Sequence, residues 1–122
     1  MSVPTALSAP AGEDIEEVSI EENVRSYFKD IPVMAKIARC ESHFRHFGSD
    51  GSVLRGDIVP SDVGVMQINE YFHADTAEAL GLDLHTLPGN LAYARDLFER
   101  EGTTPWLASV KCWGRDNHIA RK

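Results

Sequence analysis

Hydrophobic residues recur at helical spacing in several stretches of the chain. Ser19 stands before an apolar stripe with an acidic first turn, which predicts a helix from Ile20 to Lys29. Asp30 is a suitable cap for a second helix from Ile31 to about Phe44, with a proline in its first turn. The same reasoning predicts three further helices: Ala74–Leu80 stopped by Gly81, Leu87–Glu101 stopped by Gly102, and a last helix from the cap Thr104 through Cys112, closed by Gly114.

Turn residues interrupt the helical pattern between His46 and Val65. Glycine, proline and aspartate there bracket two short runs, Ser52–Arg55 and Asp57–Val59. Such bracketing is typical of a small, irregular β-hairpin or a loop region. The sequence therefore predicts an α+β fold that is mostly helical, with a small β-hairpin insertion.

The chain has 122 residues, which is the usual size of one domain. Residues 1–14 are rich in Ser, Ala, Pro and Gly and are expected to form a flexible lead-in, and residues 15–122 a single domain. The net charge of −7 disfavours nucleic acid and anionic bilayers as partners. No apolar run approaches the roughly 20 residues of a membrane span, and no secretory signal peptide is visible.

Glu41 occupies an apolar stripe of the second predicted helix. Met34, Ile37, Ala38 and Phe44 share its helix face. Removing water from a carboxyl group raises its pKa, so a Glu in this position can hold a proton near neutral pH and donate it. The alternative is a Glu at a helix end whose stem packs on the protein while its carboxylate reaches solvent.

The segment after Ser61 carries two amide side chains at alternating positions. If it is extended, Val65, Gln67 and Asn69 face one way while Met66 and Ile68 face the other. Amides suit sugar hydroxyls and N-acetyl groups because each amide both donates and accepts hydrogen bonds.

A glycine and a second carboxylate precede these amides. Gly64 allows a tight turn, and Asp62 before it would bring a carboxylate opposite Glu41. The alternative for Gln67 and Asn69 is a turn that ends in a helix cap, and for Asp62 a solvated loop acid.

Four ordered motifs together resemble a known family. They are Cys40-Glu41-Ser42, then Gly64-Val65-Met66-Gln67-Ile68-Asn69, then Asn90 with Tyr93, and then Trp106 to Trp113. In this order they resemble the lysozyme-like lytic transglycosylases that cleave bacterial peptidoglycan, over about Val33 to Gly114. The resemblance implies a lysozyme-like fold, Glu41 as the catalytic acid and base, and the Gln67 segment as a wall of the glycan cleft.

The chain departs from that family at two places. Asp62 to Asn69 is also similar to the animal-type lysozyme motif, in which the Asp before the glycine is the second catalytic carboxylate, so hydrolysis stays open. Soluble lytic transglycosylases usually carry an Ala-Tyr-Asn segment near the C-terminal helix, where this chain reads Ser109-Val110-Lys111. The role of that tyrosine has no match here.

The two cysteines allow two interpretations. Cys40 and Cys112 could be reduced core thiols, or they could be joined as in resuscitation-promoting factors, which the Cys-Glu-Ser motif and the late Trp and Cys resemble. A bond would close a loop of roughly seventy residues, worth about 4 kcal/mol of stability. It would also indicate an oxidising place, either the cell envelope (periplasm) or outside the cell.

Aromatic and histidine side chains complete the candidates. Tyr71 and Tyr93 are the preferred cleft tyrosines because their hydroxyls can bind sugar, whereas tryptophans in a small domain are more often core. His43 and His46 are three positions apart, but no Cys or carboxylate cluster completes a metal site. We predict no metal and no cofactor.

The sequence therefore predicts a monomeric enzyme that acts on peptidoglycan glycan strands. The resemblance implies that it cleaves the β-1,4 bond between N-acetylmuramic acid and N-acetylglucosamine and leaves 1,6-anhydromuramic ends. The alternatives are a hydrolytic muramidase and a non-catalytic glycan-binding module. Glu41 and Asp62 are the predicted catalytic residues, and the predicted substrate-binding residues are Ser42, Met66, Gln67, Asn69, Tyr71, Asn90 and Tyr93.

Overall fold

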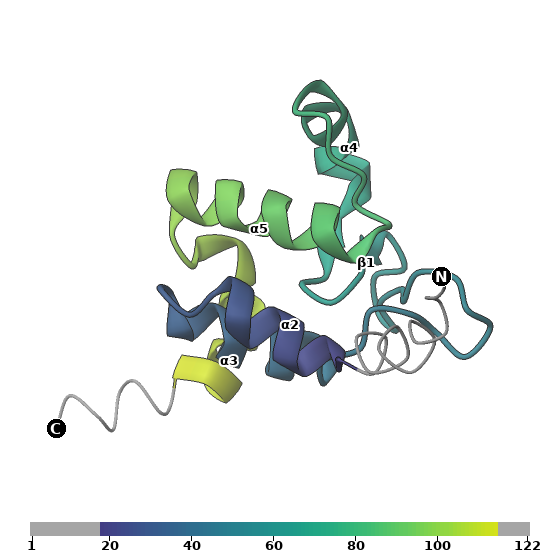
Figure 1. The fold of residues 1–122 in the computed structure, drawn as a ribbon. Helices are drawn as coiled ribbons and strands as arrows, with labels where there is room; N and C mark the ends of the chain where they lie inside the picture. The colour runs from purple at the N-terminus through teal and green to yellow at the C-terminus, as the bar shows by residue number, and fades with distance from the viewer. Residues whose placement is uncertain (1–17, 115–122) are drawn as a thin grey trace, which may run out of the picture.

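The computed structural model describes residues 18–114, so the predicted lead-in 1–14 lies outside the described residues. Along the chain come α2 (Ile20–Tyr27), α3 (Pro32–Ser42), β1 (Asp62–Val63), β2 (Ile68–Asn69), α4 (Glu70–Ala79), α5 (Leu87–Glu101) and the 3-10 helix η1 (Thr104–Ser109). Residues 110–114 continue as a short helical turn. Figure 1 shows α5 crossing the molecule beside α2 and α3, with α4 projecting away from them.

The small sheet is a two-stranded antiparallel hairpin, so the predicted α+β, mostly helical class is confirmed. Asp62 lies opposite Asn69, and Val63 lies opposite Ile68. Of the two interpretations of residues 46–65, the loop holds for the two short runs, because Ser52–Arg55 contributes only isolated bridges and Asp57–Val59 forms no strand in the described chain; the hairpin lies after them. Ile58 at the centre of the second run is 94% exposed, so that run has no buried face to hold it in a sheet.

Local capping signals explain where α2, the first described helix, begins and where α5, the longest, ends. The Ser19 hydroxyl accepts a hydrogen bond from the Glu22 amide at 3.0 Å, and the Glu22 carboxylate accepts one from the Ser19 amide at 3.1 Å. Helix α2 ends at Tyr27, two residues earlier than predicted. Helix α5 has the predicted bounds and ends before Gly102, whose φ of 65° suits glycine.

Asp30 does not cap α3 as predicted, because its carboxylate is taken by another helix. Arg95 of α5 donates to both Asp30 oxygens, at 2.9 and 3.0 Å, and this pairing lowers the pKa of Asp30. The Arg95 guanidinium also lies 4.9 Å from the ring centre of Tyr27. The cap position of α3 falls to Ile31, and Arg95 joins the α2–α3 connection to α5.

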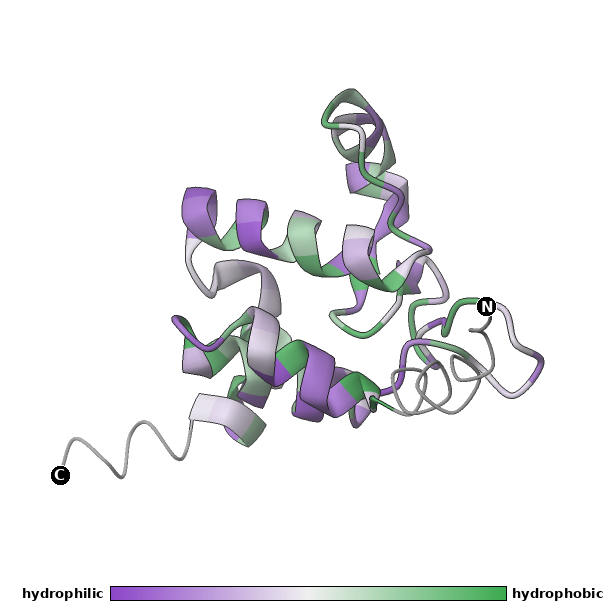
Figure 2. Cartoon of the chain, in the orientation of Figure 1, coloured by the Kyte–Doolittle hydropathy of each residue, from purple (hydrophilic) through white to green (hydrophobic). Residues whose placement is uncertain are grey.

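The core lies where α2, α3, α5 and the hairpin meet. Figure 2 shows hydrophobic and hydrophilic residues alternating along α2 and α5, as expected for helices with one buried face. Fully buried side chains come from every one of these elements: Val24, Phe28, Met34, Ile37, Val63, Ile68, Tyr93 and Leu97. Among the described residues no helix is both long and apolar enough to span a membrane.

Candidate active site

A pocket of about 240 Å³ opens where α3, the hairpin, α4, α5 and η1 converge. Four of the predicted site residues line it, namely Glu41, Asp62, Gln67 and Asn69. Its other lining residues come from all the surrounding elements: Ile68, His73, Leu97, Glu101, Pro105, Trp106 and Ala108. A larger hollow of about 450 Å³ beside α4 contains none of the predicted site residues.

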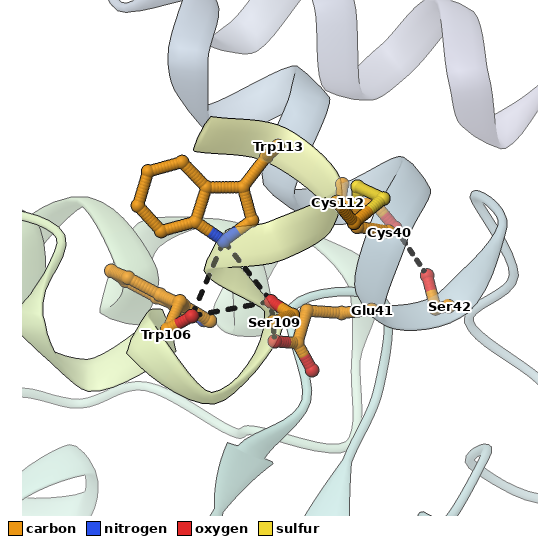
Figure 3. Close-up of a disulfide and its surroundings, with 8 residues drawn as sticks. Cys40, Glu41, Ser42, Trp106, Ser109, Cys112 and Trp113 are labelled. Atoms are coloured by element: carbon orange, nitrogen blue, oxygen red, sulfur yellow. Dashed lines mark hydrogen bonds between the residues drawn. A yellow bond between two sulfur atoms is a disulfide. The ribbon is translucent and has the colours of Figure 1, made fainter. Parts of the chain in front are cut away.

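Glu41 is half-buried in the last turn of α3. The Ser109 hydroxyl donates to its Oε2 at 2.6 Å, and Figure 3 shows the two side chains meeting between α3 and η1. Burial raises the pKa of Glu41, the Ser109 hydrogen bond opposes this, and the negative charge of Asp62 raises it further. The carboxyl group therefore holds its proton to higher pH than an exposed glutamate, as predicted from its apolar stripe.

Asp62 is the second carboxylate of the pocket. The Asn69 amide donates to Asp62 Oδ1 at 3.1 Å across the hairpin pair. Burial raises the pKa of Asp62, and the hydrogen bond from Asn69 lowers it in part. Because each carboxylate is partly withdrawn from water, the pocket disfavours having both ionised at once.

Gln67 and Asn69 both line the pocket, although the segment is not extended as predicted. Residues 64–67 form a turn in which Gln67 has a φ of 52°, and Val65 and Met66 are both buried. The Gln67 amide donates to the Gly64 carbonyl at 3.0 Å, and its Oε1 accepts from none of the described residues. Gln67 therefore keeps an acceptor and a donor hydrogen for a ligand.

Asn69 fulfils the helix-cap interpretation as well as lining the pocket. Its Oδ1 accepts from the Phe72 amide at 3.2 Å, which starts α4 four residues earlier than predicted. Its amide donates to Ser61 at 3.2 Å and to Asp62. Both amide hydrogens are thus committed to the protein, and Asn69 acts on the pocket mainly by fixing Asp62.

Four predicted substrate-binding residues, Ser42, Met66, Asn90 and Tyr93, are 0% exposed and do not line the pocket. Asn90 accepts from the Met66 amide at 2.9 Å and donates to the Val63 carbonyl at 3.0 Å. Ser42 donates to the Val65 carbonyl at 2.8 Å. Their predicted contact with substrate is corrected to a supporting role, because these bonds hold the turn behind the pocket.

Tyr93 and Tyr71 differ in their surroundings. The Tyr93 hydroxyl lies 2.9 Å from Nδ1 of His73, which lines the pocket, so Tyr93 holds a pocket residue from behind. Tyr71 is 80% exposed on α4 and stands outside the pocket, with its ring edge-to-face against Phe72 at 5.1 Å between ring centres.

Sequence reasoning missed Ser109, His73 and Glu101, which belong to this site. Ser109 contacts Glu41 although 68 positions separate them, and its only sequence signal is its place one helical turn before Cys112. His73 lies one turn after the Asn69 cap, and Glu101 is the last residue of α5. All three positions depend on contacts between elements that periodicity along the chain does not reveal.

The disulfide between Cys40 and Cys112 is confirmed, with the two Cα atoms 6.0 Å apart. It links the residue before Glu41 to the residue before Trp113 (Figure 3). Trp106 and Trp113 are buried, which agrees with the expectation that tryptophans in a small domain belong to the core. Within residues 18–114, no group of three or more His, Cys, Asp or Glu side chains is placed to bind a metal ion.

The site combines a half-buried acid, a nearby second carboxylate and an amide with free hydrogen-bonding capacity. Such a set can donate a proton to a leaving group and then accept one, which is general acid–base chemistry. Comparisons of the chain with protein-family models, curated proteins and solved structures gave no match.

Proposed function

We propose that the protein is a peptidoglycan lytic transglycosylase, which cleaves the β-1,4 bond between N-acetylmuramic acid and N-acetylglucosamine. The observation that carries the proposal is the half-buried Glu41, whose pKa is raised and which faces a pocket lined by Asp62 and Gln67. The resemblance of the ordered sequence motifs to this family supplies the substrate class.

Glu41 acts first as a general acid. Its protonated carboxyl group gives a proton to the bridging oxygen, the bond to C1 of the muramic acid breaks, and positive charge develops at that carbon. The oxygen of the substrate's own acetamido group attacks C1 and takes up this charge. Gln67 Oε1 and the uncommitted hydrogen of its amide are suited to orient an acetamido group or a sugar hydroxyl.

Glu41 acts next as a base. Having lost its proton, the carboxylate accepts the hydrogen of the C6 hydroxyl, and O6 attacks C1 as the acetamido oxygen leaves. The product is a 1,6-anhydro ring, Glu41 is protonated again, and no water is consumed. Burial favours both steps, because a carboxyl group kept from water exchanges its proton with the substrate rather than with solvent.

Asp62 favours a second candidate, hydrolysis. It lines the same pocket as Glu41, so an ionised Asp62 could stabilise C1 or attack it while water completes the reaction. We place transglycosylation first because burial raises the pKa of Asp62, whereas a stabilising carboxylate works best when it stays ionised. Asp62→Asn separates the two, since it should abolish hydrolysis but leave much of a transglycosylase activity.

The proposed substrate lies outside the cytoplasm, in the cell envelope. The intramolecular disulfide is consistent with an oxidising compartment, where such bonds persist. Because the pocket holds three carboxylates and one histidine, we expect a neutral stretch of glycan to enter it more readily than a free acid.

Release of soluble fragments from purified peptidoglycan tests the proposal. Glu41→Gln keeps the shape of the side chain but has no proton to give, so release should fall at least about 100-fold. Glu99→Gln is the matched control, because Glu99 is exposed on α5 and away from the pocket, and it should match the parent protein.

Two results would count against the proposal in different ways. Undiminished release by Glu41→Gln would remove Glu41 from the chemistry. Binding of glycan by the parent protein without any release over long incubation would make it a glycan-binding module instead.

A further inference from the structure

The hydroxyl group of Ser109 has more partners than one hydrogen can serve. Two acceptors lie within reach, Glu41 Oε2 at 2.6 Å and the Trp106 carbonyl at 3.2 Å. The indole N–H of Trp113 donates to the same hydroxyl oxygen at 3.0 Å. Figure 3 shows these groups converging on the serine. A hydroxyl has a single hydrogen and two lone pairs, so only one of the two acceptors is served at a time.

The oxygen of Glu41 that carries the proton decides how Ser109 uses its own hydrogen. When Glu41 is ionised, Ser109 donates to its Oε2, and the short distance of 2.6 Å is typical of a hydrogen bond to a charged acceptor. A proton on Oε1 leaves Oε2 as a carbonyl oxygen that still accepts from Ser109, whereas a proton on Oε2 would be donated to Ser109 and would turn the serine hydrogen to the Trp106 carbonyl. The single indole N–H of Trp113 lies 3.0 Å from the serine oxygen and 3.2 Å from the Trp106 carbonyl, so it is shared between them and helps to hold the serine oxygen in place.

We propose that Ser109 is a positioning residue for Glu41: by donating to Oε2 in both the ionised and the protonated form, it keeps the proton of Glu41 on Oε1. Oε1 is then the oxygen that gives its proton to the glycosidic oxygen and later accepts the hydrogen of the C6 hydroxyl. This catalytic consequence rests on the proposed function, whereas the effect of Ser109 on the Glu41 carboxyl group does not.

The covalent structure keeps the pair aligned. Cys40 precedes Glu41 and Cys112 follows Ser109 by three residues, so the disulfide joins the two backbones within one helical turn of each side chain. The serine therefore remains beside the acid without help from a bound ligand.

Other charged groups face Glu41 and must be considered in any pH measurement. Asp62 of β1, His73 of α4 and Glu101 of α5 line the same pocket. The charge of Asp62 raises the pKa of Glu41, and the pKa of His73 is lowered by burial. A variant of Ser109 leaves these groups in place, so a change in Glu41 can be assigned to the serine.

The test is the pKa of the Glu41 carboxyl group, followed by carbon NMR in the free protein. Ser109→Ala removes a donor to the ionised form, so the Glu41 pKa should rise by about one unit, the size expected for one hydrogen bond to a charged group. Ser109→Thr retains the hydroxyl and should restore the parent value. Ser52→Ala is the matched control, because the Ser52 hydroxyl donates to the Asp50 carboxylate at 2.7 Å outside the pocket.

Trp113→Phe gives a second route if Ser109→Ala does not fold. It removes the indole N–H that fixes the serine oxygen and keeps an aromatic ring, so the Glu41 pKa should rise by a smaller amount. An unchanged Glu41 pKa in folded Ser109→Ala would overturn the proposal, as would an unchanged value in Trp113→Phe when Ser109→Ala is unfolded. Failure of folded Ser109→Thr to restore the parent value would also overturn it.

The activity measurement adds the catalytic half of the inference. In Ser109→Ala the alkaline limb of the pH profile of kcat/KM should move upward with the Glu41 pKa, while kcat at the optimum falls about tenfold at similar KM. If the parent protein does not cleave glycan, the proposed function fails, yet the NMR titration still decides whether Ser109 controls Glu41. A pH profile that does not move despite a shifted Glu41 pKa would refute the catalytic role alone.

Discussion

Breaking the bond between Cys40 and Cys112 should destabilise the protein chiefly through its unfolded state. The two cysteines are 72 positions apart, so the disulfide holds together most of the chain that the structure describes. Without it the unfolded chain gains the freedom of a loop of that length. The Cys40→Ala/Cys112→Ala double variant, or reduction of the parent protein by a thiol, removes this constraint.

The loop length fixes the expected magnitude. The chain-entropy relation gives about 4 kcal/mol at 25 °C for a loop of this size. A domain of this length loses about 4 °C in Tm for each kcal/mol, so Tm should fall by about 16 °C. Because the unfolded state expands, the dependence of the unfolding free energy on denaturant concentration should also become steeper.

Urea unfolding of the oxidised protein, the reduced protein and the double variant measures these quantities. The reduced protein and the double variant should agree, and the reductant should leave the double variant unchanged. A loss below about 1 kcal/mol, with an unaltered denaturant dependence, would refute the loop-entropy account of this bond.

Three further predictions concern the residues behind the pocket. Asn90→Ala should lower the unfolding free energy by about 3 kcal/mol in urea titrations, because it leaves the buried Met66 amide and the Val63 carbonyl without partners. Gly64→Ala should lower the unfolding free energy more than Gly81→Ala in the same assay. Both glycines have positive φ, but a new Cβ at Gly64 would clash with the Asn90 amide, while Gly81 faces open space. Burial lowers the pKa of His46 from 6.5, so the unfolded chain takes up a proton on this histidine at a higher pH than the folded chain does. The unfolding free energy should therefore fall as pH drops below about 6.5. His46→Gln should lose this part of the pH dependence, and equal slopes in the two proteins would contradict the assignment.

The helices were predictable where their signals are local. The Ser19 capping box and the Gly102 stop act within a few residues, so α2 and α5 follow from the sequence, α5 with the correct bounds. Helix α4 begins four residues earlier than predicted because Asn69 caps it, a role that was only the alternative interpretation of this residue. Asp30 looked like a cap, but Arg95, 65 positions away, takes its carboxylate.

The sequence predicts the carboxylates of the pocket but not the residues that hold them and the adjoining turn in place. The apolar stripe of α3 indicates a half-buried Glu41, and Asp62 follows from its place before Gly64. The predicted alternation of side chains from Val65 onward was wrong. Asn90, 24 positions away, holds the Met66 amide in a turn, and this turn buries both Val65 and Met66. Ser109 reaches Glu41 through the packing of η1 on α3, which leaves no periodic signal in the sequence.

The most direct test of the proposed reaction is the mass of the glycan ends released from peptidoglycan in isotopically labelled water. The account predicts anhydromuramic ends that are one water lighter than reducing ends, without label from the solvent, and their loss in Glu41→Gln. Labelled reducing ends, or anhydro ends made equally well by Glu41→Gln, would contradict it.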